Sequence, residues 1–492
     1  MSCVKLVRKM NGLPCLVIAA ASPPVKLGVS ARLVSAMLTR IEPENTGPKT
    51  ANTPSSTAFV ARPLATPGLL CVSAVLVSIL RPRMPPAALI SLTASSTPFL
   101  KLVPEVAPAP ESSTMLAILI ACAEAALLTT GAAQAQPIKI ANVVELSGAG
   151  ATSGTNFKNG VELAVKEINA SGGILGRKIE TTTADTQSNP GVAKGLTQKA
   201  IDDNVFAVFG PVFSGSIMVS MAETRRAEIP NFTGGEAAAI TKQGNPFIFR
   251  TSFTQDTAMP KVARYIATHL KAKTVAVMFV NNDFGKGGRD AIHKSLDALG
   301  VKVVADISTD QNQVDFSAPV LKAKQANADA IFVYLNEEES ARALRELRKQ
   351  GVTKPLVGET VLASQKVIEL AGDAATGAVA HVGLTVDAPS PAMRAFRARF
   401  EKEYKYVTDH NGIKGYTGIY LMKAAIEKVG KLDRKLVAAA LHGLHVKAAD
   451  HPGVIMDVSV DANGDLDRES FVVEVKGGKQ EVKEILPALG KK

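Results

Sequence analysis

The sequence is poor in the residues that form covalent crosslinks, membrane spans and large aromatic surfaces. Its 492 residues include no tryptophan, four cysteines and 5% aromatic residues. No apolar run approaches the roughly 20 residues that a membrane-spanning helix needs, which excludes a polytopic membrane protein. Residues 136–492 contain no thiol, which excludes a disulfide scaffold and a cysteine nucleophile there. The cysteines all lie earlier: Cys3, Cys15, Cys71 and Cys122.

The chain also lacks a concentrated basic surface, although its formal net charge is +11. The first 135 residues hold 11 basic and 5 acidic residues, together with 15 of the 27 prolines. The remainder holds 45 basic and 40 acidic residues, interspersed along its length. Nucleic-acid binding requires clustered basic residues, commonly with aromatic ones. We therefore expect an ordinary solvated surface and no nucleic-acid partner.

Two different segments precede residue 136. Residues 1–114 alternate apolar stretches with Pro and Ser/Thr clusters at no steady period, so we expect an N-terminal extension that is not folded. It is either sequence upstream of a later start or a disposable leader. Residues 115–135 are apolar and end in a small-x-small pattern, which predicts a signal peptide, a mature start at Gln136 and a periplasmic protein. A lipoprotein-like box ending at Cys122 leaves lipid anchoring as the alternative.

Residues 137–492 alternate short apolar strands with amphipathic helices. Residues 156–170, for example, place Phe157, Val161 and Ile168 on one helical face. Two successive runs of this alternation predict two α/β lobes, each a doubly wound parallel sheet. Near the end Asn463-Gly464 predicts a hairpin turn between strands at 454–460 and 470–475. We expect other strands at 138–146, 178–183, 205–209, 247–250, 274–280, 302–308 and 330–335, and helices at 156–170, 191–203, 216–226, 286–299, 317–326 and 337–350.

Ligands of open α/β sheets bind beyond the carboxyl ends of the strands, where helix N-termini offer free N–H groups. Loops rich in small and polar residues follow the expected strands there. These loops are 147–154, 210–216, 233–236, 281–287, 336–339 and 358–360.

Several motifs of residues 137–492 occur in the order of a known family. They are Leu146-Ser147-Gly148, Gly160–Ala164, Glu167–Arg177, Val208–Pro211 with Ser214, Phe249–Thr251, Asp283–Gly285, Asp315–Ser317, Ala371–Ala375 with Gly377, and Tyr416. This part of the chain resembles the leucine/isoleucine/valine-binding family of ABC-transporter periplasmic receptors. The resemblance implies a type I periplasmic binding fold, with two lobes joined by three crossing strands near Phe253, Thr385 and Met456. Lobe 1 would then span about 137–253 and 386–455, and lobe 2 about 254–385 and 456–492.

The resemblance also implies a site. An amino-acid carboxylate would lie against Ser214 and Ser216, the α-ammonium would meet Glu359 from the other lobe, and Tyr416 would line the cleft near the hinge. A helix start favours an anion in any family.

The chain departs from the family's branched-chain members at several of these positions. Where they carry aromatic lids, it has Ser153, Phe284 and, roughly, Asn336. Where they carry a threonine for the carboxylate, this chain has Glu236, preceded by Gly235. Glu236 then either points outward or meets a donor or a cation of the ligand. Glu337 and the two acids after it either suit a helix dipole or receive an amide or amino group of the ligand.

The expected function is that of an extracytoplasmic solute receptor, which binds a small amino acid or amide and delivers it to a membrane permease. Alternatives are a sensory or regulatory protein on the same fold, or a receptor for an amide, urea or aromatic acid. We expect a monomer. We also expect no enzyme: the glycine turn at 148–154 is similar to that of a dehydrogenase, but the sequence has no Tyr-x-x-x-Lys pair to accompany it. No cofactor is expected. Four residues have a spacing loosely like that of metal ligands, but we expect them on a solvated surface and expect no metal: His442, His445, Asp450 and His451.

Overall fold

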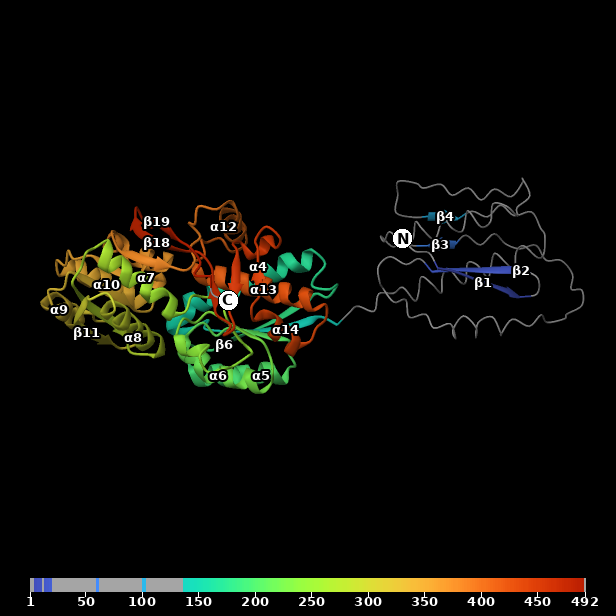
Figure 1. The fold of residues 1–492 in the computed structure, drawn as a ribbon, viewed down its shortest axis with the longest axis horizontal. Coiled ribbons are helices and arrows are strands. Elements are labelled where there is room, and N and C mark those ends of the chain that lie inside the picture. Colours follow the sequence, from blue (N-terminus) through green and yellow to red (C-terminus); the bar gives the residue numbers. More distant parts are fainter. Residues whose placement is uncertain (1–3, 11–12, 20–58, 62–99, 103–135, 491–492) are drawn as a thin grey trace, which may run out of the picture. The chain divides into compact units, whose positions relative to one another are not determined.

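The computed structural model describes residues 4–10, 13–19, 59–61, 100–102 and 136–490 (Figure 1). The chain divides into two units, residues 1–128 and 129–492. The predicted leader at 115–135, with Cys122, lies outside the described residues and stays a prediction. In the first unit the described residues form two antiparallel strand pairs: β1 (Val4–Met10) with β2 (Leu13–Ala19), and β3 (Phe59–Ala61) with β4 (Leu100–Leu102).

The second unit contains two lobes, and lobe 1 is built on a parallel sheet in the order β6, β5, β7, β8, β9. Its strand β5 alternates sides: Ile140 and Val144 join one apolar cluster, Ala141 and Val143 another. Because both faces of the strand are buried against apolar clusters, its sequence is almost continuously apolar. The strands are β5 (Ile138–Val144), β6 (Ile179–Asp185), β7 (Ala207–Phe209), β8 (Asn231–Thr233) and β9 (Ile248–Arg250).

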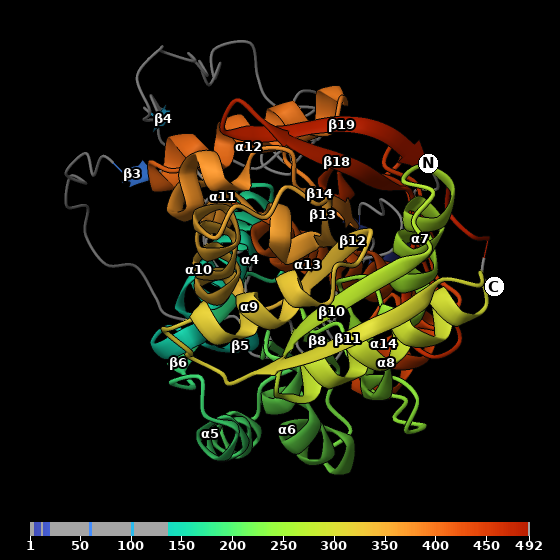
Figure 2. The ribbon, with the colours of Figure 1, turned by 90° about the vertical axis from the view of Figure 1, so that its left-hand side faces the viewer.

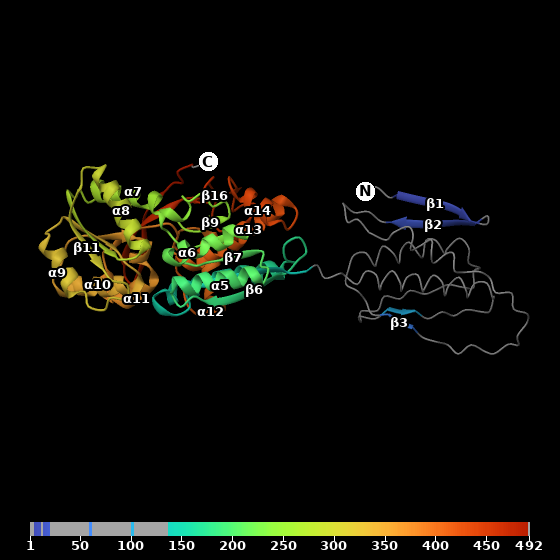
Figure 3. The same cartoon turned by 90° about the horizontal axis from the view of Figure 1, so that it is seen from below.

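Helices cover both faces of this sheet. Helices α5 and α6 pack together on one face, and α4 packs against α13 on the other (Figures 1 and 3). Among the described residues no helix is both long and apolar enough to cross a membrane. The helices of lobe 1 are α4 (Ala151–Ala170), α5 (Pro190–Asp202), α6 (Ser214–Arg226), α12 (Pro391–Tyr404), α13 (His410–Val429) and α14 (Arg434–Leu441).

Lobe 2 is built on a seven-stranded sheet in the order β11, β10, β12, β13, β14, β18, β19. Its first five strands are parallel and the last two pair antiparallel. Strand β10 again alternates: Val275 and Val277 face α7 and α8, whereas Ala276 and Met278 join the cluster containing α9 and α10 (Figure 2). Its strands are β10 (Thr274–Val280), β11 (Lys302–Thr309), β12 (Ala330–Tyr334), β13 (Leu356–Glu359), β14 (Val379–Val382), β18 (Ser470–Lys476) and β19 (Lys479–Leu486). Its helices are α7 (Gln255–Thr268), α8 (Asp283–Asp297), α9 (Ser317–Gln325), α10 (Glu337–Lys349) and α11 (Gln365–Ala371).

Three segments connect the lobes. The chain leaves β9 for α7, returns from β14 to α12, and crosses again between β17 (Leu466–Asp467) and β18. The first and third crossings are tied together, because the buried Arg468 donates from Nη2 to the carbonyl of Thr251 (3.1 Å) and lies 5.5 Å from the ring centroid of Phe253.

The third crossing therefore comes later in the chain than the expected position near Met456. Strand β16 (Val458–Val460) pairs with β15 (His445–Val446) and with β17, and Gly464 accepts a hydrogen bond from the backbone N–H of Arg250 in lobe 1. The predicted hairpin partner was wrong: the turn at Asn463-Gly464 joins β16 to β17, whereas residues 470–476 pair with β14 and β19. The buried ion pair of Arg250 with Asp465 (2.6 Å) holds the turn against lobe 1.

The sequence analysis did not predict several elements of the fold, and α7 and β8 show the reason. Helix α7 contains Pro260, a residue that argues against a helix interior, yet its apolar face packs on the lobe 2 sheet. Strand β8 is only three residues long and begins with a buried polar residue, Asn231, whose amide donates to the carbonyl of Gly210 (2.7 Å). Neither element has a local periodicity that distinguishes it from a loop.

Candidate functional site

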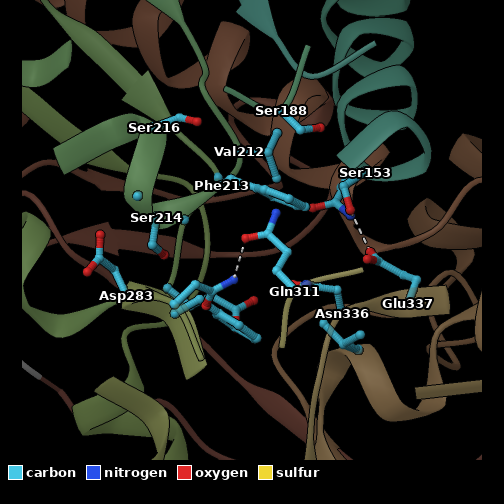
Figure 4. A pocket seen from close by; sticks show the side chains of 18 of the residues that line it. Ser153, Ser188, Val212, Phe213, Ser214, Ser216, Asp283, Gln311, Asn336 and Glu337 are labelled. Carbon is cyan, nitrogen blue, oxygen red and sulfur yellow. Dashed lines mark hydrogen bonds between the residues drawn. The ribbon is translucent and has the colours of Figure 1, made fainter. Parts of the chain in front are cut away.

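A cavity of about 210 Å³ lies between the two lobes, at the carboxyl ends of the strands of both sheets. Lobe 1 supplies the start of α4, the start of α6 and the loop after β8, and lobe 2 supplies the starts of α8 and α10 (Figure 4). Eight of the residues expected at the site line this cavity: Ser153, Ser214, Ser216, Gly235, Glu236, Phe284, Asn336 and Glu337.

One wall of the cavity is the N-terminus of α6. The helix begins at Ser214, and its first backbone hydrogen bond runs from Ile217 N to the carbonyl of Phe213. The peptide N–H groups of residues 214–216 therefore precede the intrahelical ladder. Together with the positive end of the helix dipole, they form a site suited to a carboxylate.

Behind this wall lies Glu145, a buried acid that the sequence analysis did not select. Its carboxylate accepts hydrogen bonds from the backbone N–H groups of Val212 (3.0 Å) and Phe213 (3.2 Å), and Ser216 also bonds to it. Burial raises the pKa of Glu145 despite these hydrogen bonds. Glu145 thus fixes the loop before α6 and engages the hydroxyl of Ser216. The sequence feature that could have identified Glu145 is its position as an acid directly after the mostly apolar strand β5.

Glu236 points inward and is paired within its own lobe. Its Oε1 lies 3.1 Å from Nζ of Lys414 on α13, and Lys414 also donates to the carbonyl of Gly234 (3.2 Å). From lobe 2, the hydroxyl of Tyr334 lies 3.4 Å from Glu236 Oε2. Burial, reinforced by the neighbouring Glu359, raises the pKa of Glu236 to about 7. Lys414 had no local signal in the sequence, because only the packing of α13 brings it to the cavity.

Glu359 does not line the cavity. Its Oε1 accepts from the hydroxyl of Thr360 (2.6 Å) and lies 3.3 Å from Nδ1 of His381. Its Oε2 is buried and has no hydrogen-bond partner among the described residues, and its carboxyl group interacts with that of Glu236. Burial raises the pKa of Glu359 and lowers the pKa of His381 to about 3. Glu236 and Glu359 therefore face each other across the lobes as a carboxyl pair suited to share one proton.

Tyr416 also lies away from the cavity. Its hydroxyl donates to Glu167 Oε2 (2.5 Å) on α4, and its ring packs against Phe396 of α12. It belongs to the interior of lobe 1 and not to the cleft near the hinge. The structure instead brings to the cavity several residues that sequence reasoning missed, including Ser188, Phe213, Gln311, His410, Asn411 and Lys414.

The wall formed by lobe 2 carries Glu337, the first residue of α10. The hydroxyl of Ser153 on α4 donates to Glu337 Oε1 (2.5 Å), which links the two lobes. Burial raises the pKa of Glu337 to about 7. Glu339, in contrast, accepts from the backbone N–H of Asn336 (3.1 Å) in a capping box and from the backbone N–H of Asn312 in the loop after β11, so it holds structure within lobe 2.

The raised pKa values of Glu236 and Glu337 predict a pH-dependent stability. Both values lie near 7, above the ordinary 4.5, so between these pH values the folded protein binds protons that the unfolded chain releases. Their contribution is fully present below about pH 4.5 and is lost as the pH rises through about 7. We expect the Tm of the wild type to fall from about pH 5.5 to about pH 8 by more than that of the double variant Glu236→Gln/Glu337→Gln. Calorimetry at constant ionic strength measures both slopes, and equal slopes would contradict the assignment.

Two α/β lobes with a cavity between facing strand ends define the class of two-lobed solute receptors with a type I periplasmic binding fold. A family model described as periplasmic binding protein matches residues 137–480, and the chain belongs to this family. Members of the family are receptors for small molecules and work outside the cytoplasm with ABC transporters. The resemblance found in the sequence is therefore confirmed.

Known proteins agree with this assignment. The chain is 28% identical over 336 residues to the Leu/Ile/Val-binding protein BraC3 of Rhizobium johnstonii, covering 68% of this chain and 90% of the relative. Its structure is similar to that of a branched-chain amino acid transporter substrate binding protein from Streptococcus pneumoniae in complex with isoleucine (TM-score 0.65, 26% identity, covering 71% of this chain and 99% of that one). A solute binding protein from R. palustris in complex with benzoate shares the fold (TM-score 0.67, 23% identity, covering 72% and 98%).

Proposed function

We propose that this protein is the extracytoplasmic solute receptor of an ABC transporter. In this role it binds a small carboxylate ligand, an amino acid or a related amide, between its lobes and presents it to permease subunits in the membrane. The observation that carries the proposal is the start of α6, where three residues whose peptide N–H groups precede the helical hydrogen bonds line a cavity between the lobes. The names of BraC3 and of the isoleucine-bound protein support the amino-acid class.

A second ligand class is favoured by the position of Glu359. This acid would meet an α-ammonium group in the family's amino-acid receptors, but here it is engaged by Thr360 and His381 behind the cavity wall. A carboxylic acid without an α-ammonium group, as in the benzoate-bound neighbour, does not need Glu359 as a partner.

The organisation of the chain follows from this role. We propose that residues 115–135 are removed on export and that residues 136–492 act as a monomer in the periplasm. Residues 1–114 have no part in ligand binding in this proposal. Intact-mass measurement of the protein isolated from its cell envelope tests the processing, and a mature chain that retains residues 1–114 or carries a lipid on Cys122 would contradict it.

A thermal-shift screen of the purified protein tests the function itself. We expect at least one member of a panel of amino acids, amides, ureas and aromatic acids to raise the Tm in a concentration-dependent way. Ser214→Ala should weaken that binding about 10- to 100-fold, because it removes a hydroxyl from the carboxylate site. Ser295→Ala, on helix α8 and outside the cavity lining, is the matched control. A panel without any response, or equal affinity of the Ser214 variant, would contradict the proposal.

A further inference from the structure

One carboxyl group on the cavity wall has a role that the carboxylate site does not explain. Glu337 is 3% exposed, lines the cavity and begins α10 in lobe 2. In Figure 4 it lies with Ser153 on one side of the cavity, and Ser214 and Ser216 lie on the other. A ligand whose carboxylate binds at α6 therefore turns its far end toward Glu337.

Among the described residues, Glu337 has a single side-chain donor and no cationic partner. Ser153 donates to Oε1, and the neighbouring charges of Asp409 and Glu338 are of like sign and raise its pKa further. The one lysine of the cavity lining, Lys414, is already bonded to Glu236. Asn336 donates its side-chain amide to Glu339 (2.7 Å) and so does not serve Glu337.

A second acceptor, Asn411 on α13, lines the same cavity from lobe 1. Oδ1 of Asn411 is buried and accepts no hydrogen bond within residues 136–490, and Asn411 lines the cavity. Its backbone N–H and its side-chain amide both donate to Asp409, the residue whose charge acts on Glu337. A buried acceptor without a donor is destabilising, so a ligand that supplies a donor here removes that cost.

We propose that Glu337 is the specificity-determining residue of this receptor, and that its ligand is a small carboxylate carrying an N–H or O–H donor at the end remote from the carboxylate. The proposal rests on the function proposed above and narrows its ligand class. The donor meets Glu337 and Asn411, whereas Ser214 and the start of α6 hold the carboxylate. An acid of the same shape whose far end is a methyl group leaves Asn411 Oδ1 without a donor and gives Glu337 no donor beyond Ser153, so it is rejected.

Shape-matched ligand pairs test this assignment. Titration calorimetry with asparagine against leucine, and with 4-hydroxybenzoate against 4-methylbenzoate, compares acids that differ mainly in the donor. We expect the donor-bearing member of the pair that binds to have a Kd at least tenfold lower. Glu337→Leu should reduce this ratio to below about threefold, with affinity for the methyl-bearing acid retained or increased.

Two controls separate this test from the test of the function. Glu369→Leu changes an exposed glutamate of α11 that does not line the cavity, and should leave the ratio unchanged. Glu337→Gln can still accept the hydrogen bond from Ser153. This variant therefore shows whether a change of affinity in Glu337→Leu comes from a folding defect. Equal affinities within the binding pair, or an unchanged ratio in Glu337→Leu, overturn the assignment while the receptor function stands. If none of the four acids binds, and no other carboxylate shifts the Tm, the receptor function and this assignment fail together.

Discussion

Replacing Lys414 by methionine is expected to lower the free energy of unfolding by about 3–5 kcal/mol at about pH 8. Lys414 and Glu236 are both buried in lobe 1, with Nζ and Oε1 3.1 Å apart. Removing the cation leaves a buried carboxylate without its counter-charge and beside a second acid, Glu359. Protonation of Glu236 relieves this cost, so the loss should be clearly smaller at about pH 6. Urea unfolding of the ligand-free protein at the two pH values measures it.

The double variant Lys414→Met/Glu236→Gln separates the ion pair from packing. Once the carboxylate is replaced by a neutral amide, most of the loss should be recovered and its pH dependence should disappear. Lys402→Met, on the exposed side of α12, is the matched control and should change stability by less than about 0.5 kcal/mol. A loss in Lys414→Met that persists unchanged in the double variant would show that the lysine stem, and not its charge, stabilises lobe 1.

The second large effect concerns the close contact of α4 with α13. A Cβ atom added at Gly160 would lie 2.0 Å from the carbonyl oxygen of Gly412, a backbone atom that cannot move without its helix. We expect Gly160→Ala to cost about 3 kcal/mol or more, at the upper end of the range for overpacked cores, because two helix backbones must separate. The midpoint of urea unfolding measures the change.

Gly195→Ala is the matched control for this substitution. Gly195 is an exposed residue within α5, and a Cβ atom there would meet nothing within 4 Å. The same chemical change should therefore stabilise the protein by about 0.5–1 kcal/mol, through the better helix propensity of alanine. A similar loss at both positions would contradict the assignment of the effect to the contact between α4 and α13.

The sequence predicted those elements whose periodicity is set by a core on both sides. Strand β10 was predicted at its observed bounds, since Val275, Val277 and Phe279 serve one apolar cluster and the residues between them serve the other. Helix α7 was missed, because the pattern of a single helix does not show that packing compensates for a proline. Strand β8 depends on the hydrogen bonds of Asn231 to another loop, which local sequence does not contain.

The site was predictable where its residues come from the loops that follow strands. Ser214 and Glu337 lie at helix starts that the fold must bring to one edge of each sheet. Lys414 and Asn411 come from α13, a long way along the chain, and only tertiary packing places them at the cavity. Glu359 was assigned to the ligand by resemblance, but its direction depends on Thr360, His381 and the opposing acid, which sequence position alone does not reveal.

The contacts of Arg468 have a consequence for how the lobes separate. Since this side chain joins the third crossing to Thr251 and Phe253 in the first, those two strands move as one body. We therefore expect the lobes to separate by rotation about an axis beside these two crossings more readily than by sliding sideways. A rotation of this kind keeps the two walls of the cavity facing each other as a solute enters or leaves.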